Sequence, residues 1–201
     1  MACPHTTSAP SAWVRRWSHL VAPGGSVLDV ACGSGRHVRW FTDRSCRVTG
    51  VDRDASALQS LAANAEVVVA DIENGPWPLA GRRFDAVVVT HYLWRPLLPT
   101  LLASVADGGV LIWETFSAGN ETVGKPSNPL FLLRSGELLG MVQGLRVVAF
   151  EEGYDDGPPR FMQRIVAVRD AAAAAHPARH RLSDGAASSG QVKSGDSEDP
   201  P

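Results

Sequence analysis

Two glycines follow an apolar run at a position where the chain could hold a small charged ligand. Residues 27–36 read Val-Leu-Asp-Val-Ala-Cys-Gly-Ser-Gly-Arg, so that Gly33 and Gly35 form a turn after the apolar run. Glycine lets the backbone bend with positive φ and lets a ligand approach the chain closely. If a helix follows, its first N–H groups are free to face an anionic group. The pattern predicts a ligand-binding turn between a strand and a helix.

Three acidic residues accompany this turn and specify the ligand further. Asp29 lies inside the apolar run, where a carboxylate is costly unless it has a partner such as a ligand ammonium group. Asp52 ends the next apolar run, 19 residues after Gly33, a spacing at which an acid accepts both ribose hydroxyls. Asp71 and Ile72 end a third run, where they could meet an adenine amino group. An amine, a ribose and an adenine together fit S-adenosylmethionine.

A nicotinamide dinucleotide is the alternative ligand for this turn. Its fingerprint, G-x-G-x-x-G/A, needs a small third residue where the helix packs closely on the strand. The chain has Val38 there, and the fingerprint does not require an acid such as Asp29 inside the strand. The residues therefore favour the methyl donor over the dinucleotide.

Short apolar runs alternate with segments that carry helix signals. Five runs are nearly continuous in apolar residues, as in parallel strands covered on both faces: residues 26–32, 46–52, 66–72, 84–90 and 109–115. N-capping residues, an early proline and helical spacing of apolar residues mark four segments between or after them: residues 36–43, 54–64, 96–106 and 135–143. This order predicts an α/β fold in which the carboxyl ends of parallel strands meet at one edge.

The two ends of the domain complete this architecture. Residues 13–21 have apolar side chains on one side and predict a preceding helix. Residues 145–152 and 161–169 are two β-rich runs, joined by the turn-rich residues 153–159, and should pair as an antiparallel hairpin. We therefore expect a Rossmann-like, seven-stranded, mainly parallel sheet with helices on both faces and a C-terminal antiparallel hairpin.

The composition is that of one globular domain with additions at each end. Of 201 residues, 44% are hydrophobic and 20% are charged, and the net charge is −2. This balance excludes a mostly disordered chain and is unlike that of bulk nucleic-acid binders, which show a strongly basic face. We expect a flexible lead over residues 1–10, a folded domain over residues 11–170 and a disordered tail over residues 171–201, because the tail has few apolar side chains.

The cysteines, the histidines and the hydropathy of the sequence allow predictions about cellular location and metal binding. The three cysteines form no CxxC pair, which is typical of reduced cytosolic thiols. The first residues lack the order of a signal peptide, and no apolar run approaches the roughly 20 residues that span a bilayer. We therefore expect a cytoplasmic protein without membrane association. His37, His176 and His180 have no partners at metal-ligand spacing, so we expect no metal site.

The ordered series of motifs resembles that of the class I S-adenosylmethionine-dependent methyltransferases. Residues 27–35 are similar to the first motif of that family, V-L-D-x-x-C-G-x-G, which is specific. Residues 51–52 match its ribose motif, residues 70–72 its adenine motif, and residues 84–91 and 108–112 its fourth-strand and fifth-strand motifs. The resemblance covers about residues 24–170 and implies a seven-stranded sheet whose last strand is antiparallel between its neighbours.

The resemblance implies a cofactor-binding role for eight residues. Asp29 would lie beside the methionyl amine, through water or backbone, and Asp52 would bind the ribose hydroxyls. Asp71 would take the adenine amino group and the Ile72 N–H would face the ring. Four further residues would complete the S-adenosylmethionine site: Cys32, Gly33, Gly35 and His91.

The second half of the chain narrows the resemblance and supplies candidates for the acceptor side. Residues 128–139 and 144–152 are similar to the tellurite-resistance-type methyltransferases, which implies a small acceptor such as an oxyanion or a thiol-like compound. No residue is a certain catalytic base, and the candidate catalytic residues are His91, Tyr92 and Glu114. Aromatic and basic side chains give the candidate substrate residues, which are Tyr92, Trp94, Arg95 and Arg134.

We therefore expect an S-adenosylmethionine-dependent methyltransferase that acts on a small molecule as a monomer or homodimer. One alternative is a non-catalytic protein that binds S-adenosylmethionine or scaffolds a partner, although the intact glycines and three acids argue against a degenerate site. Another alternative is an RNA or protein methyltransferase. The chain lacks an N-P-P-[YF]-type motif after the fourth strand, where it reads Thr90-His-Tyr-Leu.

Overall fold

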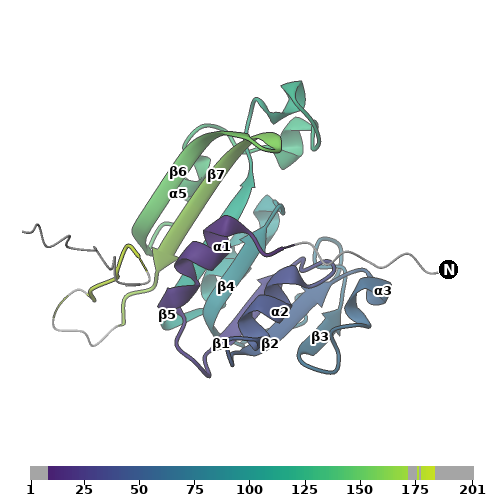
Figure 1. The fold of residues 1–201 in the computed structure, drawn as a ribbon, viewed down its shortest axis with the longest axis vertical. Coiled ribbons are helices and arrows are strands. Elements are labelled where there is room, and N and C mark those ends of the chain that lie inside the picture. Colours follow the sequence, from purple (N-terminus) through teal and green to yellow (C-terminus); the bar gives the residue numbers. More distant parts are fainter. Residues whose placement is uncertain (1–8, 172–175, 177, 184–201) are drawn as a thin grey trace, which may run out of the picture.

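The computed structural model describes residues 9–171, 176 and 178–183. Residues 1–8 of the expected lead lie outside the described residues, as do residues 172–175, 177 and 184–201 of the expected tail. Within the described part of the chain, one seven-stranded sheet organises the fold (Figure 1).

The strand order of the sheet is β3-β2-β1-β4-β5-β7-β6. Strands β1 to β5 pair in parallel, whereas β7 is antiparallel to both β5 and β6 (Figure 1). The predicted Rossmann-like sheet with its C-terminal hairpin is therefore confirmed. The strands are β1 (Ser26–Val30), β2 (Arg47–Asp52), β3 (Glu66–Val69), β4 (Phe84–Thr90), β5 (Val105–Phe116), β6 (Arg146–Asp156) and β7 (Pro159–Val168).

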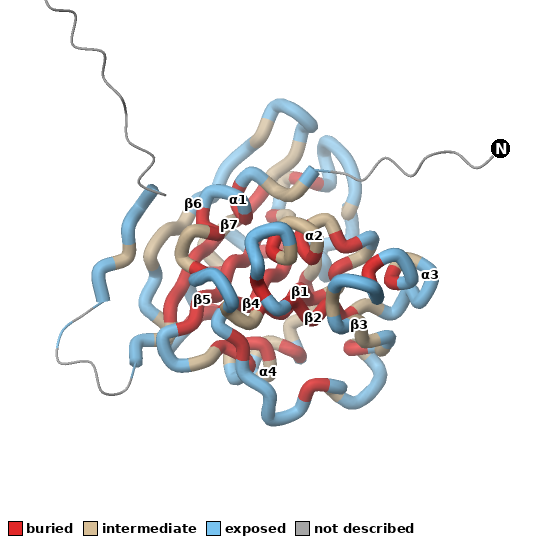
Figure 2. The backbone as a smooth tube through the Cα atoms, turned by 60° about the horizontal axis from the view of Figure 1, so that its bottom comes forward, coloured by how far each residue is buried: buried red, intermediate tan, exposed pale blue. Residues whose placement is uncertain are grey.

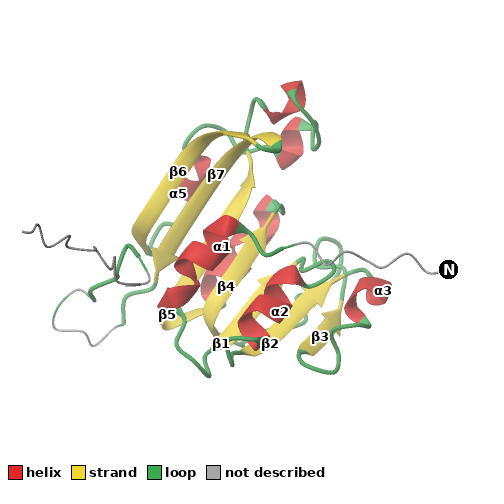
Figure 3. Ribbon diagram, in the orientation of Figure 1, coloured by secondary structure: helices red, strands yellow, loops and turns green. Residues whose placement is uncertain are grey.

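Helices cover both faces of the sheet (Figure 3). The α-helices are α1 (Ala12–Trp17), α2 (Arg36–Thr42), α3 (Ala55–Leu58), α4 (Leu98–Ala103) and α5 (Glu137–Met141). Short 3₁₀ helices are η1 (Ser18–Leu20), η2 (Arg95–Leu97), η3 (Asn120–Thr122) and η4 (Pro129–Phe131). One buried cluster joins α1, α2 and α3 to the sheet, and a second joins α4 and α5 to its other face. Because both faces are covered, buried backbone follows the central strands (Figure 2).

Three boundaries differ from the sequence expectations. Strand β5 begins at Val105 rather than at residue 109, so α4 ends earlier, at Ala103. The pairing of β4 with β5 is irregular here, and Gly108 has a φ of +78°, which lets the strand continue through a bulge. Helix α3 is one turn long rather than spanning residues 54–64, although Asp54 is its N-cap as expected.

The hairpin is longer than the sequence suggested. Strand β6 continues to Asp156 and β7 starts at Pro159, so residues 153–159 are mostly strand rather than a loop. Cross-strand side chains explain the extension. The rings of Tyr154 and Phe161 pack 4.9 Å apart, and Arg160 Nε donates to Asp155 across the pair at 3.0 Å.

Candidate functional site

The carboxyl ends of neighbouring strands bring four of the predicted site residues around one cavity of about 270 Å³. Asp52 ends β2, Asp71 and Ile72 follow β3, and Tyr92 follows β4. Ligands in open α/β sheets bind at this edge, beside the point where the strand order reverses. The complete lining is Ala31, Asp52, Arg53, Ala70, Asp71, Ile72, Glu73 and Tyr92.

Two residues at this edge have a left-handed backbone without being glycine. Ala31 directly follows β1 and has a φ of +52°, and His91 directly follows β4 and has a φ of +55°. Strands β1 and β4 are adjacent, and the strand order reverses between them. Such backbone strain concentrates at binding sites, where the surrounding structure holds it in place. The strain therefore points to the same edge as the cavity.

Asp52 fixes the glycine turn and keeps acceptor capacity for a ligand. Its Oδ2 accepts a hydrogen bond from the Gly33 N–H at 2.7 Å, and its Oδ1 accepts from the Asp54 N–H at 3.0 Å. An ionised carboxylate has about four lone-pair sites, so each oxygen can accept one more hydrogen bond. The arrangement suits a pair of neighbouring hydroxyl groups.

Asp71 is held as an ionised acceptor at the other side of the cavity. Asn74 Nδ2 donates to Asp71 Oδ2 at 2.9 Å, and the N–H groups of Glu73 and Asn74 donate to Oδ1 at 3.0 and 3.1 Å. These donors, the Asn74 side chain first, hold the pKa of Asp71 below its usual range. The carboxylate can still accept a hydrogen bond from a ligand amino group.

Asp29 is the most unusual group in the site. Its side chain is 1% exposed, and among the described residues neither carboxylate oxygen has a partner with hydrogen-bond geometry, although the Val38 backbone N–H faces the carboxylate and acts to lower its pKa. Burial raises the pKa of Asp29 to about 7; Arg36 works against this shift and the charge of Asp52 adds to it. Buried polar groups are nearly always satisfied, because an unpaired one costs free energy. A positively charged ligand group would satisfy this carboxylate.

The glycine turn has the geometry that its sequence indicates. Gly33 and Gly35 have φ values of +52° and +74°, and a Cβ on Gly35 would overlap the Leu61 side chain. The Cys32 N–H donates to the Val51 carbonyl at 3.1 Å, which ties the turn to β2. Burial and the Asp29 charge raise the pKa of the Cys32 thiol, so the thiol stays protonated and serves packing.

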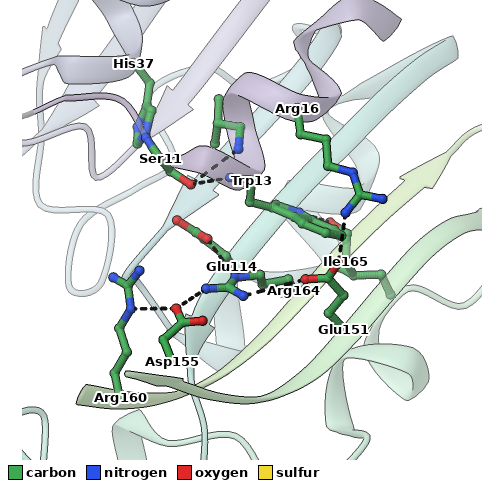
Figure 4. Close-up of polar contacts among 11 residues, drawn as sticks. Ser11, Trp13, Arg16, His37, Glu114, Glu151, Asp155, Arg160, Arg164 and Ile165 are labelled. Carbon is green, nitrogen blue, oxygen red and sulfur yellow. Dashed lines mark hydrogen bonds and ion pairs between the residues drawn. The ribbon is translucent and has the colours of Figure 1, made fainter. Parts of the chain in front are cut away.

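His91 and Glu114 lie on neighbouring strand ends toward the hairpin. The His91 N–H donates to the Glu114 carbonyl at 2.9 Å, and the His91 ring packs 4.9 Å from Phe116. Partial burial of the ring lowers the pKa of His91, whereas the Glu114 charge raises it. Glu114 is nearly buried and accepts from Arg164 Nε at 3.3 Å (Figure 4). The neutral imidazole and the carboxylate are both able to accept a proton.

Tyr92 and Trp94 follow His91 in the same loop. The loop is anchored by Trp113, whose Nε1 donates to the Tyr92 carbonyl at 3.2 Å. Burial raises the pKa of the Tyr92 hydroxyl, and the Glu73 and Asp71 carboxylates raise it further, so the phenol remains a neutral donor. The side chains of Tyr92 and Trp94 both pack against the hydrophobic core on the α4 face, and Tyr92 also lines the cavity with Asp71.

Arg95 and Arg134 have different environments. Arg95 donates to both Glu137 oxygens, at 2.6 and 2.9 Å, and to the carbonyls of Leu130 and Leu132. Four of its five N–H groups are therefore committed, and the guanidinium ties η2 to η4 and α5. The Arg134 side chain is exposed, and its main-chain carbonyl accepts from Gln163 Nε2.

Sequence reasoning missed four charged or titratable residues at this site. Arg53 and Glu73 line the cavity, and their positions directly after Asp52 and Ile72 were the available signal. Arg36 and His37 begin α2 and face Asp29. The sequence does not indicate that Arg36 and His37 face Asp29, because this contact depends on how α2 packs on β1.

Metal-ligand clusters and membrane-spanning helices are both absent from the described residues. There, no three or more His, Cys, Asp or Glu side chains gather in a way that could hold a metal ion. No helix in residues 9–171 or in the short described stretches after them is long and apolar enough to cross a membrane.

The first half of the domain is similar in sequence to known proteins. Residues 27–108 match the family model described as a methyltransferase domain. A malonyl-[acyl-carrier protein] O-methyltransferase from Serratia marcescens is 34% identical over 108 residues, 49% of this chain and 41% of the relative. A ribosomal protein L11 methyltransferase from Burkholderia mallei is 36% identical over 111 residues, 52% of this chain and 35% of the relative. The chain thus spans less than half the length of these curated relatives.

A solved structure extends the similarity to the whole fold. TehB from Haemophilus influenzae superposes with a TM-score of 0.68 at 17% identity, covering 83% of this chain and 64% of that protein. The seven-stranded order 3-2-1-4-5-7-6, the glycine turn and the strand-end acids accompany the match to the domain model. Residues 27–108 therefore carry a methyltransferase domain, and the described chain has the fold of the class I S-adenosylmethionine-dependent methyltransferases.

Proposed function

We propose that the protein transfers a methyl group from S-adenosylmethionine to a small-molecule acceptor. The observation that carries the proposal is the buried Asp29 carboxylate, whose two oxygens have no partner with hydrogen-bond geometry among the described residues. Asp29 lies two residues before Ala31, which lines the acid-lined cavity of about 270 Å³. S-adenosylmethionine combines an ammonium group, a ribose diol and an adenine. The site offers an acceptor suited to each of these groups.

The proposed assignment follows the positions of the acids. Asp29 would receive the ammonium group, directly or through water, and Asp52 the ribose hydroxyls. Asp71 and Ile72 would face the adenine, and the turn residues Cys32, Gly33 and Gly35 would contact the methionyl part with their backbone. Arg36, which forms no ion pair within the described residues, is available for a carboxylate.

The protein's own contribution to the reaction is orientation and exclusion of water. S-adenosylmethionine, when bound, supplies an activated methyl group. Fixed positioning of two reactants can supply several kcal/mol of the barrier reduction, about 7–11 in well-oriented intramolecular systems. His91, with its lowered pKa, or Glu114 would accept a proton from an acceptor that carries one. An acceptor that is already anionic would not require this step.

The acceptor side is proposed to lie between the loop after β4 and the hairpin. Tyr92, Trp94 and Arg134 are its candidate contacts, and the commitments of Arg95 give that residue a positioning role instead. Small oxyanions and thiol-like compounds are the acceptor classes to test first. We further propose a cytoplasmic monomer or homodimer that does not act on nucleic acid.

A protein acceptor is the second candidate, and the similarity to ribosomal protein L11 methyltransferases favours it. That similarity covers only 35% of the relative's length. A binding protein that senses S-adenosylmethionine without transferring the methyl group is the third possibility.

Calorimetry and label transfer test these proposals in turn. We expect S-adenosylmethionine and S-adenosylhomocysteine to bind and NAD not to bind; the absence of S-adenosylmethionine binding at millimolar concentration would overturn the proposal. Transfer of labelled methyl to a panel of thiols, oxyanions and carboxylic acids would support a small-molecule acceptor. Transfer only to protein in a cell extract would support the second candidate, and binding without any transfer would support the third.

A further inference from the structure

His37 occupies a junction between the glycine turn and three other elements. It is the second residue of α2, directly after the turn, and its side chain is 1% exposed. Its ring contacts Ser11 at the start of α1, Thr90 at the end of β4 and Asp29 in β1.

The direction of one hydrogen bond fixes the protonation of the ring. The Ser11 N–H donates to His37 Nε2 at 3.1 Å (Figure 4). A backbone N–H can only donate, so Nε2 must offer its lone pair. A neutral histidine with an accepting Nε2 carries its proton on Nδ1. Ser11 is also the N-cap of α1, so the start of that helix is attached to this ring.

The protonated nitrogen faces the buried acid of the cofactor site. His37 Nδ1 lies 3.4 Å from Thr90 Oγ1 and 4.0 Å from Asp29 Oδ2. Thr90 Oγ1 is thus the hydrogen-bond acceptor of the Nδ1–H, while the partial positive charge of this N–H lies near Asp29 Oδ2 at a distance too long for a hydrogen bond. His37 Nδ1 and the backbone N–H of Val38, which acts to lower the pKa of Asp29, are two uncharged donors that face this carboxylate.

We propose that His37 is a positioning residue for Asp29, which it presents to the ammonium group of S-adenosylmethionine through its Nδ1–H while its Nε2 holds the start of α1. The inference rests on the proposed function. A neutral donor suits this position, because a second buried positive charge would repel the ligand ammonium. Burial first, and then the charges of Arg36 and His91, lower the pKa of His37 to about 3, so the ring stays neutral at ordinary pH.

Two conservative variants separate the two tasks of the ring. An asparagine at position 37 can place an amide N–H near the site of Nδ1, whereas a glutamine can place an amide oxygen near the site of Nε2. We expect His37→Gln to weaken S-adenosylhomocysteine binding by about tenfold to a hundredfold, the effect of losing a polar contact with a charged group. We expect His37→Asn to recover most of that loss. His19→Gln, a change in the half-buried histidine of η1, is the matched control.

The pH dependence of binding distinguishes a positioning role of His37 from a role in packing alone, because a loss of packing would not shift the pH midpoint of binding. Binding should strengthen as Asp29 ionises, and the midpoint should rise in His37→Gln because the ionised form loses its donor. Four other titratable groups influence the pKa values in this region and are unchanged in every variant: Arg36 from α2, Asp52 from β2, the Cys32 thiol and His91.

The Ser11 hydrogen bond has its own pair of variants. Ser11 has a φ of −52°, which proline can adopt, so Ser11→Pro removes the N–H, and with it the side-chain cap. Ser11→Ala removes only the cap. We expect Ser11→Pro to weaken binding several-fold more than Ser11→Ala, and the excess to disappear in the His37→Asn background.

Nuclear magnetic resonance of the wild-type protein tests the tautomer without any variant. Nitrogen-15 shifts of His37 should show a protonated Nδ1 and an unprotonated Nε2, and the opposite assignment would overturn the inference. Equal affinity and equal pH midpoints for wild type and His37→Gln would also overturn it, while leaving the proposed function intact. Failure of the wild type to bind S-adenosylhomocysteine would instead defeat the proposed function itself.

Discussion

At the scale of single residues, the environments of Asp29 and Asp71 have opposite effects on the two carboxylates. Asp29 is buried without a partner of hydrogen-bond geometry among the described residues, and its raised pKa is the physical sign of the cost of that burial. By contrast, the donors around Asp71 hold its pKa low. Two acids that both lie at strand ends therefore have opposite protonation preferences, because one is desolvated and the other is surrounded by N–H groups.

Asp29→Asn should stabilise the unliganded protein above neutral pH. A pKa raised from 3.8 to about 7 means that the folded state binds the proton more tightly than the unfolded state, so stability falls as pH rises through this window. The asparagine removes that loss, which is worth up to about 4 kcal/mol. Urea unfolding should show the variant more stable at pH 8, with the difference shrinking below pH 4. S-adenosylmethionine binding should be lost. A variant that is less stable than wild type at pH 8 would contradict the argument.

Asp52→Asn should weaken S-adenosylmethionine binding by about tenfold to a hundredfold, because a charged acceptor is replaced by a neutral one. Asp54→Asn is the matched control, since this neighbouring exposed acid caps α3 and does not line the cavity. Calorimetry at one pH compares the two variants. Equal losses in both would mean that the ribose site is misplaced.

At the scale of elements, the glycine turn and the hairpin illustrate two ways of fixing a site. The turn uses backbone conformation, since Gly35 both has positive φ and faces Leu61 without room for a Cβ. The hairpin uses charges: Arg164 contacts Glu114, Asp155 and Glu151, and so joins β7 to β5 and β6 (Figure 4).

Gly35→Ala should cost more stability than Gly24→Ala. Both glycines have positive φ, near +74° and +77°, so both changes cost about 1–2 kcal/mol in backbone strain. Only position 35 adds overlap with Leu61, worth about 1–3 kcal/mol more. Thermal unfolding measures the difference, and a Leu61→Ala background should reduce it. Equal costs at the two positions would refute the packing argument.

Arg164→Met should destabilise the fold by about 3–5 kcal/mol, because it leaves the nearly buried Glu114 without its partner. The Arg164 side chain is only 18% exposed. Arg146→Met removes a pair with Asp170 in which both side chains are nearly half exposed, and should cost less than about 1 kcal/mol. Chemical unfolding compares the two variants. A similar small cost for both would show that the hairpin network is dispensable.

At the scale of the whole molecule, two buried clusters on opposite faces of the sheet account for the fold. Among the described residues, the buried apolar side chains run from Trp13 to Val168. This span supports the proposal that residues 11–170 form the folded domain.

Removal of residues 184–201 should therefore leave the domain unchanged. A chain that ends at Ser183 should keep its melting temperature within about 2 °C and its affinity for S-adenosylhomocysteine, because Val192 is the only sizeable apolar side chain that it loses. Differential scanning fluorimetry and calorimetry check this. A fall of more than about 5 °C would show that the removed residues contribute to stability.

The sequence by itself determined the α/β order, the seven strands and the acids at three strand ends. Short apolar runs, glycine turns and capping residues are local signals, and the parallel sheet brings its strand ends together whatever the details of packing. The lengths of the strands were not predicted from the sequence. The hairpin exceeds its apolar runs because cross-strand pairs such as Tyr154 and Phe161 extend it, and β5 starts early because Gly108 lets the strand continue through a bulge.

Only the tertiary structure decided how each charged group is used. Arg95 and Arg134 look alike in sequence, yet one is bound to Glu137 and two carbonyls, and the other is exposed. The contact of His37 with Asp29 depends on how α2 packs over β1. Burial, pKa and hydrogen-bond direction are properties of such three-dimensional neighbourhoods, so residue types and spacing alone do not determine them.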